Sequence, residues 1–319
     1  MAKLLRGKPV ADAVVANARA RADALMRRGV RPTLAVVRVG ADPGDLSYER
    51  TLAKRAEAAG VGVQVQALPA DALQEQLEAA LAAVSADASI HGCLLFRPLP
   101  AGLDEAAACA LIAPAKDVDG ITRASLASVL AGDALLPSSS GLCGEAAGAG
   151  DASAPFSAAG FAPSTAEACV RLLDFYDVPL SGARVTVVGR SLVVGRPLAL
   201  LLTARDATVT LCHSRTRDVP SACRAADVVV LATGRARAFD GSFFREGQTV
   251  LDVGVSFDET GAMCGDADAS SVEPVVAALT PVPGGIGSVT TAVTLEHVVA
   301  AAERASLWHL GSTRAHPGP

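Results

Sequence analysis

The fold expected for this chain is decided by one stretch, Val185-Thr-Val-Val-Gly-Arg-Ser-Leu-Val-Val-Gly-Arg-Pro-Leu-Ala-Leu-Leu-Leu202. Four β-forming residues run into a glycine turn, and an apolar helical pattern follows within a few residues. A strand, a tight turn and a helix start form a common phosphate site, because N–H groups at a helix N-terminus favour an anion. Gly189 and Gly195 let the backbone come close to a ligand, and Pro197 suits the first helical turn. We therefore expect a phosphate-binding turn here, with plain turn chemistry as the alternative.

The next strand indicates which cofactor would bind. The turn itself reads Gly-Arg-Ser-x-x-x-Gly-x-Pro and contains Arg190 and Ser191. About 20 residues after the first glycine, a dinucleotide fold presents the side chain that reads the ribose, usually Asp or Glu for NAD. This chain has no acid there and instead carries hydroxyls, an imidazole and a guanidinium: His213, Ser214, Arg215 and Thr216. These groups suit a 2′-phosphate, so the sequence favours NADP over NAD; a solvated arginine at a strand end is the alternative.

Length and composition limit the classes of protein. The chain has 319 residues, of which 50% are hydrophobic and 19% charged, enough for two domains with sizeable cores. A net charge of −5 without a basic run makes nucleic acid and anionic membranes poor partners. No apolar segment approaches the roughly 20 residues of a membrane span, and the N-terminus has no signal-peptide pattern. The seven cysteines are scattered without metal spacing. We expect reduced thiols, no metal and a cytoplasmic protein.

Strands and helices alternate along the chain. The strands are expected at residues 33–39, 61–67, 91–96, 185–188, 207–216, 227–232 and 249–255. The helices are expected at residues 9–28, 47–59, 71–84, 104–112, 165–176 and 289–305. This alternation predicts an α/β fold with parallel sheets covered by helices. Residues 138–160 are rich in Gly, Ala and Ser without periodicity, which predicts a flexible loop or insert.

Six motifs stand in a fixed order along the chain. They are Gly7-Lys-Pro-Val-Ala11, Val39-Gly-x-Asp-Pro43 with Tyr48, Pro98-Leu-Pro100, Lys116-Asp-Val-Asp-Gly120, Val188-Gly-Arg-Ser-x-Val-Val-Gly-x-Pro197 and Pro281-Val-Pro-Gly-Gly-Ile-Gly287. Together they resemble the bifunctional methylenetetrahydrofolate dehydrogenase/methenyltetrahydrofolate cyclohydrolase family, over about residues 5 to 305. The chain is a divergent member on this comparison.

The resemblance implies an architecture and a reaction. It implies a three-layer α/β folate-binding catalytic domain, residues 1–137 plus 288–319, and a Rossmann-like NADP-binding domain, residues 161–287, with residues 138–160 as the insert. The implied reaction is NADP-dependent oxidation of 5,10-methylenetetrahydrofolate to the 5,10-methenyl form. Hydrolysis to 10-formyltetrahydrofolate would follow, in one-carbon metabolism that supplies purine biosynthesis. Family members are usually homodimers joined through the cofactor domain.

The resemblance also implies roles for individual residues. Tyr48 would be a platform for a flat heterocycle and Asp119 an acceptor for the amino-pyrimidine edge of a pterin, so both are candidate catalytic residues. The alternatives are a core tyrosine and an Asx turn, and the turn role suits Asp117 better. The cofactor site would add residues that follow later strands: Thr233, Gly234 and Gly285.

Two departures from the family weaken the expectation of proton transfer. The family has a catalytic Lys four residues after the Tyr, where this chain has Leu52, and a partner Gln before Leu-Pro-Leu-Pro, where it has Phe96. Lys54 is one of only four lysines and the candidate replacement. However, residues 52 and 54 are about 200° apart on an ideal helix, so only a late or distorted helix start would bring the amine inward.

Hydride transfer mainly needs two carbons held close together, whereas hydrolysis needs positioned acids and bases. We therefore expect the dehydrogenase activity more firmly than the cyclohydrolase activity. The alternatives are a related NAD(P) dehydrogenase acting on another small substrate, and a non-catalytic protein that binds folate or a dinucleotide.

Overall fold

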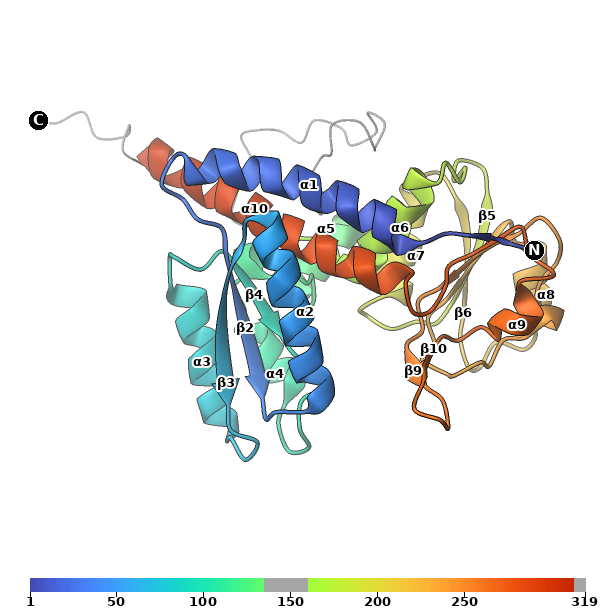
Figure 1. The fold of residues 1–319 in the computed structure, drawn as a ribbon, viewed down its shortest axis with the longest axis horizontal. Coiled ribbons are helices and arrows are strands. Elements are labelled where there is room, and N and C mark those ends of the chain that lie inside the picture. Colours follow the sequence, from blue (N-terminus) through green and yellow to red (C-terminus); the bar gives the residue numbers. More distant parts are fainter. Residues whose placement is uncertain (135–159, 313–319) are drawn as a thin grey trace, which may run out of the picture. The chain divides into compact units, whose positions relative to one another are not determined.

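The structure is a computed structural model that describes residues 1–134 and 160–312. These residues form two compact units, drawn in Figure 1. Unit 1 comprises residues 1–12 and 163–293, and unit 2 comprises residues 13–134, 160–162 and 294–312. The loop predicted at residues 138–160 lies outside the described residues, apart from its last position.

Unit 1 is built on a six-stranded, fully parallel sheet with the strand order β1-β11-β8-β7-β5-β6. Its strands are β1 (Lys3–Leu4), β5 (Arg184–Val188), β6 (Thr208–Cys212), β7 (Val228–Leu231), β8 (Thr249–Asp252) and β11 (Ala278–Leu279). The chain leaves β5 toward one side of the sheet and β7 toward the other. The carboxyl ends of these two neighbouring strands therefore form the switch point where α/β sheets bind ligands.

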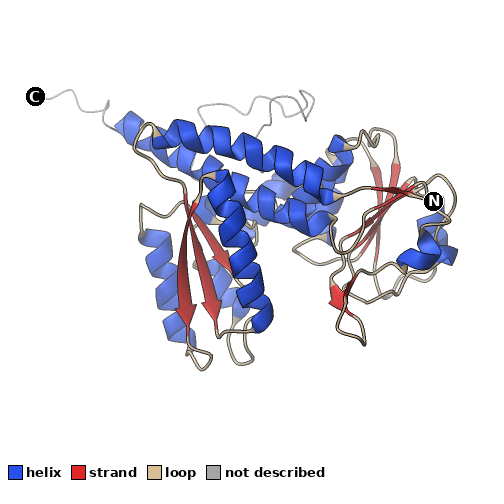
Figure 2. Ribbon diagram, in the orientation of Figure 1, coloured by secondary structure: helices blue, strands red, loops and turns tan. Residues whose placement is uncertain are grey.

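Helices cover both faces of this sheet, as Figure 2 shows. They are α6 (Ser164–Phe175), α7 (Gly195–Thr203), α8 (Val219–Ala225) and the short α9 (Ala269–Val272), with a 3₁₀ turn at Gly241–Phe243. A hairpin of β9 (Ser256–Phe257) and β10 (Met263–Cys264) follows β8. Alternate residues of β5 and β7 enter two separate cores: Val187 and Val230 pack in one, Val188 and Val229 in the other. This alternation is the period of two that strand geometry imposes on a sheet buried on both faces.

Unit 2 has a three-stranded parallel sheet with the order β3-β2-β4. The strands are β2 (Thr33–Val39), β3 (Gly62–Leu68) and β4 (Gly92–Leu95), and the helices are α2 (Pro43–Ala59), α3 (Gln74–Ala86), α4 (Glu105–Ala110) and α5 (Arg123–Ala131), with a 3₁₀ turn at Pro114–Lys116. Leu34 and Val36 face one core, whereas Ala35 and Val37 face the other. The three-layer α/β architecture expected for the folate domain is confirmed.

Two long helices have residues in both units, α1 (Gly7–Met26) and α10 (Ile286–Ser312). Within unit 2 they lie side by side (Figure 1), because Arg21 reaches the fully buried Glu296 at 3.2 Å and Glu303 at 2.6 Å. The fully buried His297 of α10 contacts the backbone carbonyl of Val118 through Nδ1 at 2.8 Å. These contacts hold the last helix, α10, against the rest of unit 2.

The division into units differs from the expected one near the N-terminus. The sequence places residues 1–137 in a single domain, whereas residues 1–12 belong to unit 1. The physical reason is that β1 pairs with β11, so the first strand completes the edge of the six-stranded sheet. Such a pairing between residues far apart in the sequence leaves no local signal.

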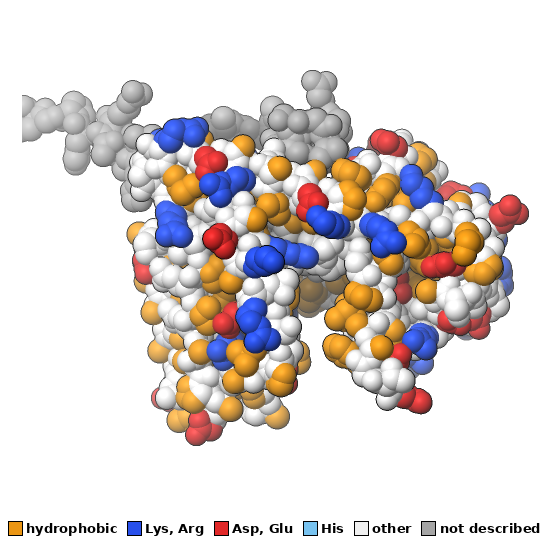
Figure 3. All heavy atoms as spheres, in the orientation of Figure 1, with side chains coloured by type: hydrophobic (Ala, Val, Ile, Leu, Met, Phe, Trp, Pro, Cys, Tyr) orange, Lys and Arg blue, Asp and Glu red, His pale blue; other side chains and the backbone are white. Residues whose placement is uncertain are grey.

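The surface and the cysteines are unremarkable within the described residues. On the face drawn in Figure 3, Lys and Arg side chains are interspersed with Asp and Glu side chains. None of the described helices is long and apolar enough to cross a membrane. Six cysteines lie in the described residues; all six are unpaired and five of them are buried. Burial raises the pKa of Cys93, Cys169 and Cys223 to about 12, so these thiols stay protonated.

Candidate functional site

The turn after β5 requires its two glycines for steric reasons. Gly189 has φ +131°, and a Cβ there would lie 2.2 Å from the carbonyl oxygen of Ala232. A Cβ on Gly195 would lie 2.0 Å from the carbonyl oxygen of Gly189. The hydroxyl of Ser191 accepts the N–H of Val194 at 3.1 Å inside the turn. Helix α7 begins at Gly195 and contains Pro197 in its first turn. The tight strand–turn–helix predicted from the sequence is therefore present.

The end of β6 lies beside this turn. Gly189 donates its N–H to the carbonyl of Cys212 at 2.9 Å, so His213 directly follows the contact. A second small turn holds the next residues, because His213 N–H donates to the hydroxyl of Thr216 at 2.9 Å. His213 Nδ1 in turn accepts the N–H of Arg215 at 3.1 Å. Ser214 and Arg215 are exposed. A hydroxyl and a guanidinium are therefore accessible just after the carboxyl end of β6, next to the Gly189 turn. These groups fit a 2′-phosphate.

The loop after β7 is held by two buried carboxylates. Asp266 accepts the N–H and the hydroxyl of Thr233 at 2.6 and 2.9 Å, and the N–H of Arg235 at 2.7 Å. These contacts flank Gly234, whose φ is +66°. Thr233 and Gly234 therefore follow the strand end at the switch point beside Gly189, as the sequence predicts for cofactor-site residues.

Asp252, the last residue of β8, supports Asp266 in turn. Its carboxylate accepts three backbone N–H groups, from Gly254 at 3.0 Å, Asp266 at 3.0 Å and Ala267 at 2.8 Å. Burial outweighs these donors and raises the pKa of Asp252 to about 6. Sequence reasoning missed both carboxylates. The available signal was an Asp that ends an apolar strand, Thr249-Val-Leu-Asp252, where a carboxylate would otherwise be costly to bury.

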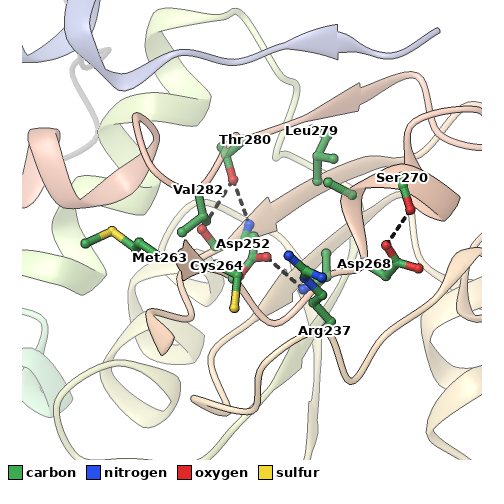
Figure 4. A pocket seen from close by; sticks show the side chains of 12 residues that line it. Arg237, Asp252, Met263, Cys264, Asp268, Ser270, Leu279, Thr280 and Val282 are labelled. Carbon is green, nitrogen blue, oxygen red and sulfur yellow. Dashed lines mark hydrogen bonds between the residues drawn. The ribbon is translucent and has the colours of Figure 1, made fainter. Parts of the chain in front are cut away.

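A pocket of about 250 Å³ lies against this network, at the carboxyl edge of the same sheet. Figure 4 shows Asp252 and Thr280 on its wall, with Met263 and Cys264 from the hairpin. The N–H of Asp252 donates to the hydroxyl of Thr280 at 2.7 Å, which fixes this wall of the pocket.

The second glycine loop packs on the start of α1. Gly7 donates its N–H to the carbonyl of Gly284 at 2.8 Å, and a Cβ on Gly7 would lie 2.0 Å from the carbonyl oxygen of Gly285. A Cβ on Gly285 would itself lie 2.5 Å from the carbonyl oxygen of Pro281. The loop therefore tolerates no side chain at these positions, and the backbone forms the surface there.

In unit 2, Tyr48 lies close to Leu52 and Phe96, the two residues that replace the family's Lys and Gln. Tyr48 is 39% exposed, and its ring centroid lies 5.4 Å from that of Phe96 at an interplanar angle of 51°. Leu52, one turn further along α2, is fully buried in the same core as Phe96, which is 6% exposed. Tyr48 is thus an exposed aromatic platform, and apolar packing underlies it where the family has its Lys and Gln.

The structure does not bring Lys54 to this group. Asp42 caps α2, and the helix runs regularly from Pro43 to Ala59, so it starts earlier than the residue 47 expected from the sequence. Lys54 is exposed, about 200° around the helix from the buried Leu52. The late or distorted helix start that a relocated amine requires is absent from α2. The candidate catalytic assignment of Lys54 is therefore not supported by its position.

The other three lysines have structural contacts. Lys116 donates to the carbonyls of Val84 and Asp87 at 3.0 and 2.6 Å, and burial lowers its pKa. Lys8 pairs with Asp12 at 2.6 Å, and Lys3 lies over the ring of Tyr176 at 5.2 Å.

Asp117 and Asp119 have different environments, as expected. Asp117 is fully buried and accepts the N–H groups of Ile121 and Thr122 and the hydroxyl of Ser125, at 3.0, 2.8 and 2.6 Å. It holds the turn before α5. Asp119 is 17% exposed and faces Arg97, whose Nη2 lies 3.6 Å from Asp119 Oδ2. A partly exposed carboxylate of this kind suits a ligand with paired N–H donors.

No metal site accompanies these residues: the described part of the chain holds no group of three or more His, Cys, Asp or Glu side chains placed around a common ion. What the geometry defines is an α/β protein with a dinucleotide turn at the switch point of one sheet and an aromatic–carboxylate pair on another unit.

Comparison with known proteins identifies the family. Residues 5–119 match the catalytic domain of the tetrahydrofolate dehydrogenase/cyclohydrolase family, and residues 163–306 match its NAD(P)-binding domain. The bifunctional protein FolD of Carboxydothermus hydrogenoformans is 43% identical over 305 residues, which cover 95% of this chain and 98% of that one. FolD of Clostridioides difficile is 41% identical, covering 94% and 96%. The chain belongs to the tetrahydrofolate dehydrogenase/cyclohydrolase family of enzymes.

Solved structures agree with this assignment. The bifunctional FolD of Campylobacter jejuni superposes with a TM-score of 0.84 at 30% identity, covering 95% of this chain and 99% of that one. The Trypanosoma brucei dehydrogenase-cyclohydrolase, solved in complex with NADP and an inhibitor, gives a TM-score of 0.83 at 30% identity, covering 96% and 98%.

Proposed function

We propose that this protein is a methylenetetrahydrofolate dehydrogenase that uses NADP, with methenyltetrahydrofolate cyclohydrolase activity as its second reaction. The observation that carries the proposal is Asp119, a partly exposed carboxylate in the same unit as the exposed ring of Tyr48, while Asp117 performs the structural work of the turn. A pterin needs a flat surface and a paired acceptor, and these two side chains supply both.

The cofactor assignment is supported by the chain's own residues. The Gly189–Gly195 turn is so tight that a Cβ at either glycine would collide with a backbone carbonyl oxygen, and helix N–H groups there favour a pyrophosphate. Ser214 and Arg215, after β6, would hold the 2′-phosphate, and Asp266 fixes Thr233 and Gly234 after β7, on the other side of the Gly189 turn. NADP, when bound, supplies the hydride acceptor. The protein's residues bind and orient the reactants, which is the main requirement of hydride transfer.

The hydrolytic half is supported by family membership and by relatives named as bifunctional. In this chain it would proceed without the family's Lys and Gln, because Leu52 and Phe96 are packed in the core. We therefore propose a slow second reaction. We also propose a homodimer joined through unit 1, a small-molecule folate as the substrate, and a cytoplasmic place in one-carbon metabolism.

The test is an assay of the purified protein with methylenetetrahydrofolate and either NADP or NAD. Reduced cofactor and methenyl product are quantified separately, because acid destroys the reduced cofactor and preserves the methenyl product. Formation of both with NADP is the expected result. If the folate does not reduce the cofactor but another small hydroxy or carbonyl substrate does, the result would favour a related dehydrogenase. Tight folate and NADP binding without turnover would favour a binding protein.

A further inference from the structure

Arg97 is the residue that follows Phe96 and stands where the family has the first Leu of Leu-Pro-Leu-Pro. Its guanidinium lies between two carboxylates. Nη1 is 3.2 Å from Glu105 Oε1, and Nη2 is 3.6 Å from Asp119 Oδ2. The side chain is 20% exposed, and Glu105 is more exposed than either of the other two groups. The loop after β4 therefore places a fixed positive charge beside the carboxylate that would bind the pterin.

One edge of this guanidinium is under-used. Arg97 Nε is buried and has no hydrogen-bond partner among the described residues. In the planar guanidinium, Nε–H and one Nη2–H point along the same edge. Arg97 Nη2 and Asp119 Oδ2, 3.6 Å apart, form an ion pair, but this distance is too long for a good hydrogen bond. A buried donor without an acceptor costs roughly 1–3 kcal/mol, so the position is favourable for an acceptor supplied by a ligand.

The pterin ring offers such an acceptor next to the groups that Asp119 would bind. Its pyrimidine edge presents, in order, the 2-amino group, the N3–H and the 4-oxo group, that is, two donors followed by an acceptor. A carboxylate satisfies the two donors, and the oxo group then needs a donor at the neighbouring position. The Nε–H/Nη2–H edge of Arg97 is such a donor beside Asp119.

We propose that Arg97 is a specificity residue that donates its Nε–H/Nη2–H edge to the 4-oxo group of the pterin, while Asp119 accepts from the 2-amino group and N3–H. This inference rests on the proposed function, because it names a further contact of the same folate site. A guanidinium does not give up its proton in proteins, so an arginine here orients the ring but does not relay a proton. It therefore differs in role from the Lys that Leu52 replaces.

The ligand-side experiment needs no variant. Tetrahydrofolate and its 4-thioxo analogue are titrated into the intact protein in the presence of NADP. Sulfur is a weaker acceptor than oxygen, whereas the 2-amino and N3–H donors are retained for Asp119. We expect the oxo compound to bind on the order of 10-fold more tightly, as for the weakening of one charge-assisted hydrogen bond.

The protein-side experiment repeats both titrations with Arg97→Met, which keeps much of the side-chain length and removes the donors. We expect the affinity for tetrahydrofolate to fall by on the order of 10- to 100-fold and the preference for oxo over thioxo to shrink to within about twofold. Arg28→Met, in the exposed turn after α1, is the matched control and should keep the full preference. NADP affinity and the thermal transition of Arg97→Met report whether the variant is folded.

The outcomes separate the two proposals. If the unmodified protein binds no tetrahydrofolate and oxidises no methylenetetrahydrofolate, the proposed function fails. If it does both, and the oxo preference is unchanged in folded Arg97→Met, the function stands and the assignment of Arg97 is wrong. If the variant is unfolded, the titration of the unmodified protein decides, since equal affinities for the oxo and thioxo compounds contradict the assignment.

Discussion

The carboxylate of Asp252 accepts the backbone N–H of Asp266 at 3.0 Å, and the carboxylate of Asp266 holds both ends of the turn at Thr233 and Arg235. Two buried carboxylates are thus linked by hydrogen bonds, and together they connect the end of β8 to the loop that follows β7. Backbone N–H groups and the hydroxyl of Thr233 donate to the oxygens of the two carboxylates. A conformation fixed in this way is pre-organised for a ligand at the switch point.

The first prediction concerns the pH dependence of stability. The pKa of Asp252 is 3.8 in its ordinary state and about 6 in the folded protein, because burial favours the neutral acid. The folded state then binds more protons than the unfolded state between these pH values. The stabilisation that Asp252 gives the folded state is therefore fully present below pH 3.8 and is lost as pH rises through 6. The free energy of unfolding of the unmodified protein should fall by about 1–3 kcal/mol over this window relative to Asp252→Asn.

Urea unfolding of both proteins at intervals between about pH 4 and pH 7 measures this difference. Parallel curves would show that Asp252 does not titrate in this window.

The second prediction concerns the choice of cofactor. Arg215 is exposed at the end of β6, beside the turn that Gly189 forms. Arg215→Ala should weaken NADP binding by about 1.5–3 kcal/mol and NAD binding very little, because only NADP has a phosphate to lose the charge-assisted contact. Calorimetric titration with each cofactor measures this. Arg184→Ala, which removes an exposed arginine paired with Asp227 at the amino end of β5, is the control. Equal losses for NADP and NAD in Arg215→Ala would contradict the 2′-phosphate role.

The third prediction concerns the folate. Asp119→Asn should weaken tetrahydrofolate by about 1.5–3 kcal/mol and leave NADP affinity nearly unchanged, because the amide no longer offers two acceptor oxygens to the pterin. Equilibrium titration of the variant with each compound tests this split. Asp117→Asn is the contrasting variant: it should lower the thermal transition, since Asp117 is fully buried and accepts three donors. An Asp119→Asn variant with unchanged folate affinity would leave Asp119 as a turn residue only.

The fourth prediction concerns the balance of the two reactions. Methenyl product should accumulate during turnover, because a positioned acid or base contributes roughly 10²–10⁴-fold to a reaction and Leu52 offers none. Lys54→Met should change neither rate, since Lys54 is exposed on the far side of α2 from Leu52.

Following reduced cofactor and methenyl product over time measures both rates. Brisk methenyl hydrolysis that is abolished by Lys54→Met would overturn this prediction and make Lys54 the catalytic amine after all.

Much of the fold follows from local patterns in the sequence. The strands in unit 2 and the turn at Gly189 are encoded by residues that are neighbours in the chain, through runs of β-forming residues and glycine's steric freedom. The same holds for the contrast between Asp117 and Asp119, since a short Asx turn involves residues a few positions apart. The replacement of the family's Lys and Gln by Leu52 and Phe96 is likewise plain from the sequence once the motifs are aligned.

The tertiary structure decided what depends on segments that are distant in the chain. The sequence alone places Arg97 next to Phe96, but its ion pair with Asp119 needs the loops after β4 and before α5 to meet. Asp252 and Asp266 find each other, and the loop at Thr233, only because parallel strands end at one edge of the sheet. Leu52 is buried and Lys54 exposed because α2 is a regular helix whose Leu52 side packs into the core of unit 2. Side-chain identity is local, whereas burial and partners are set by packing.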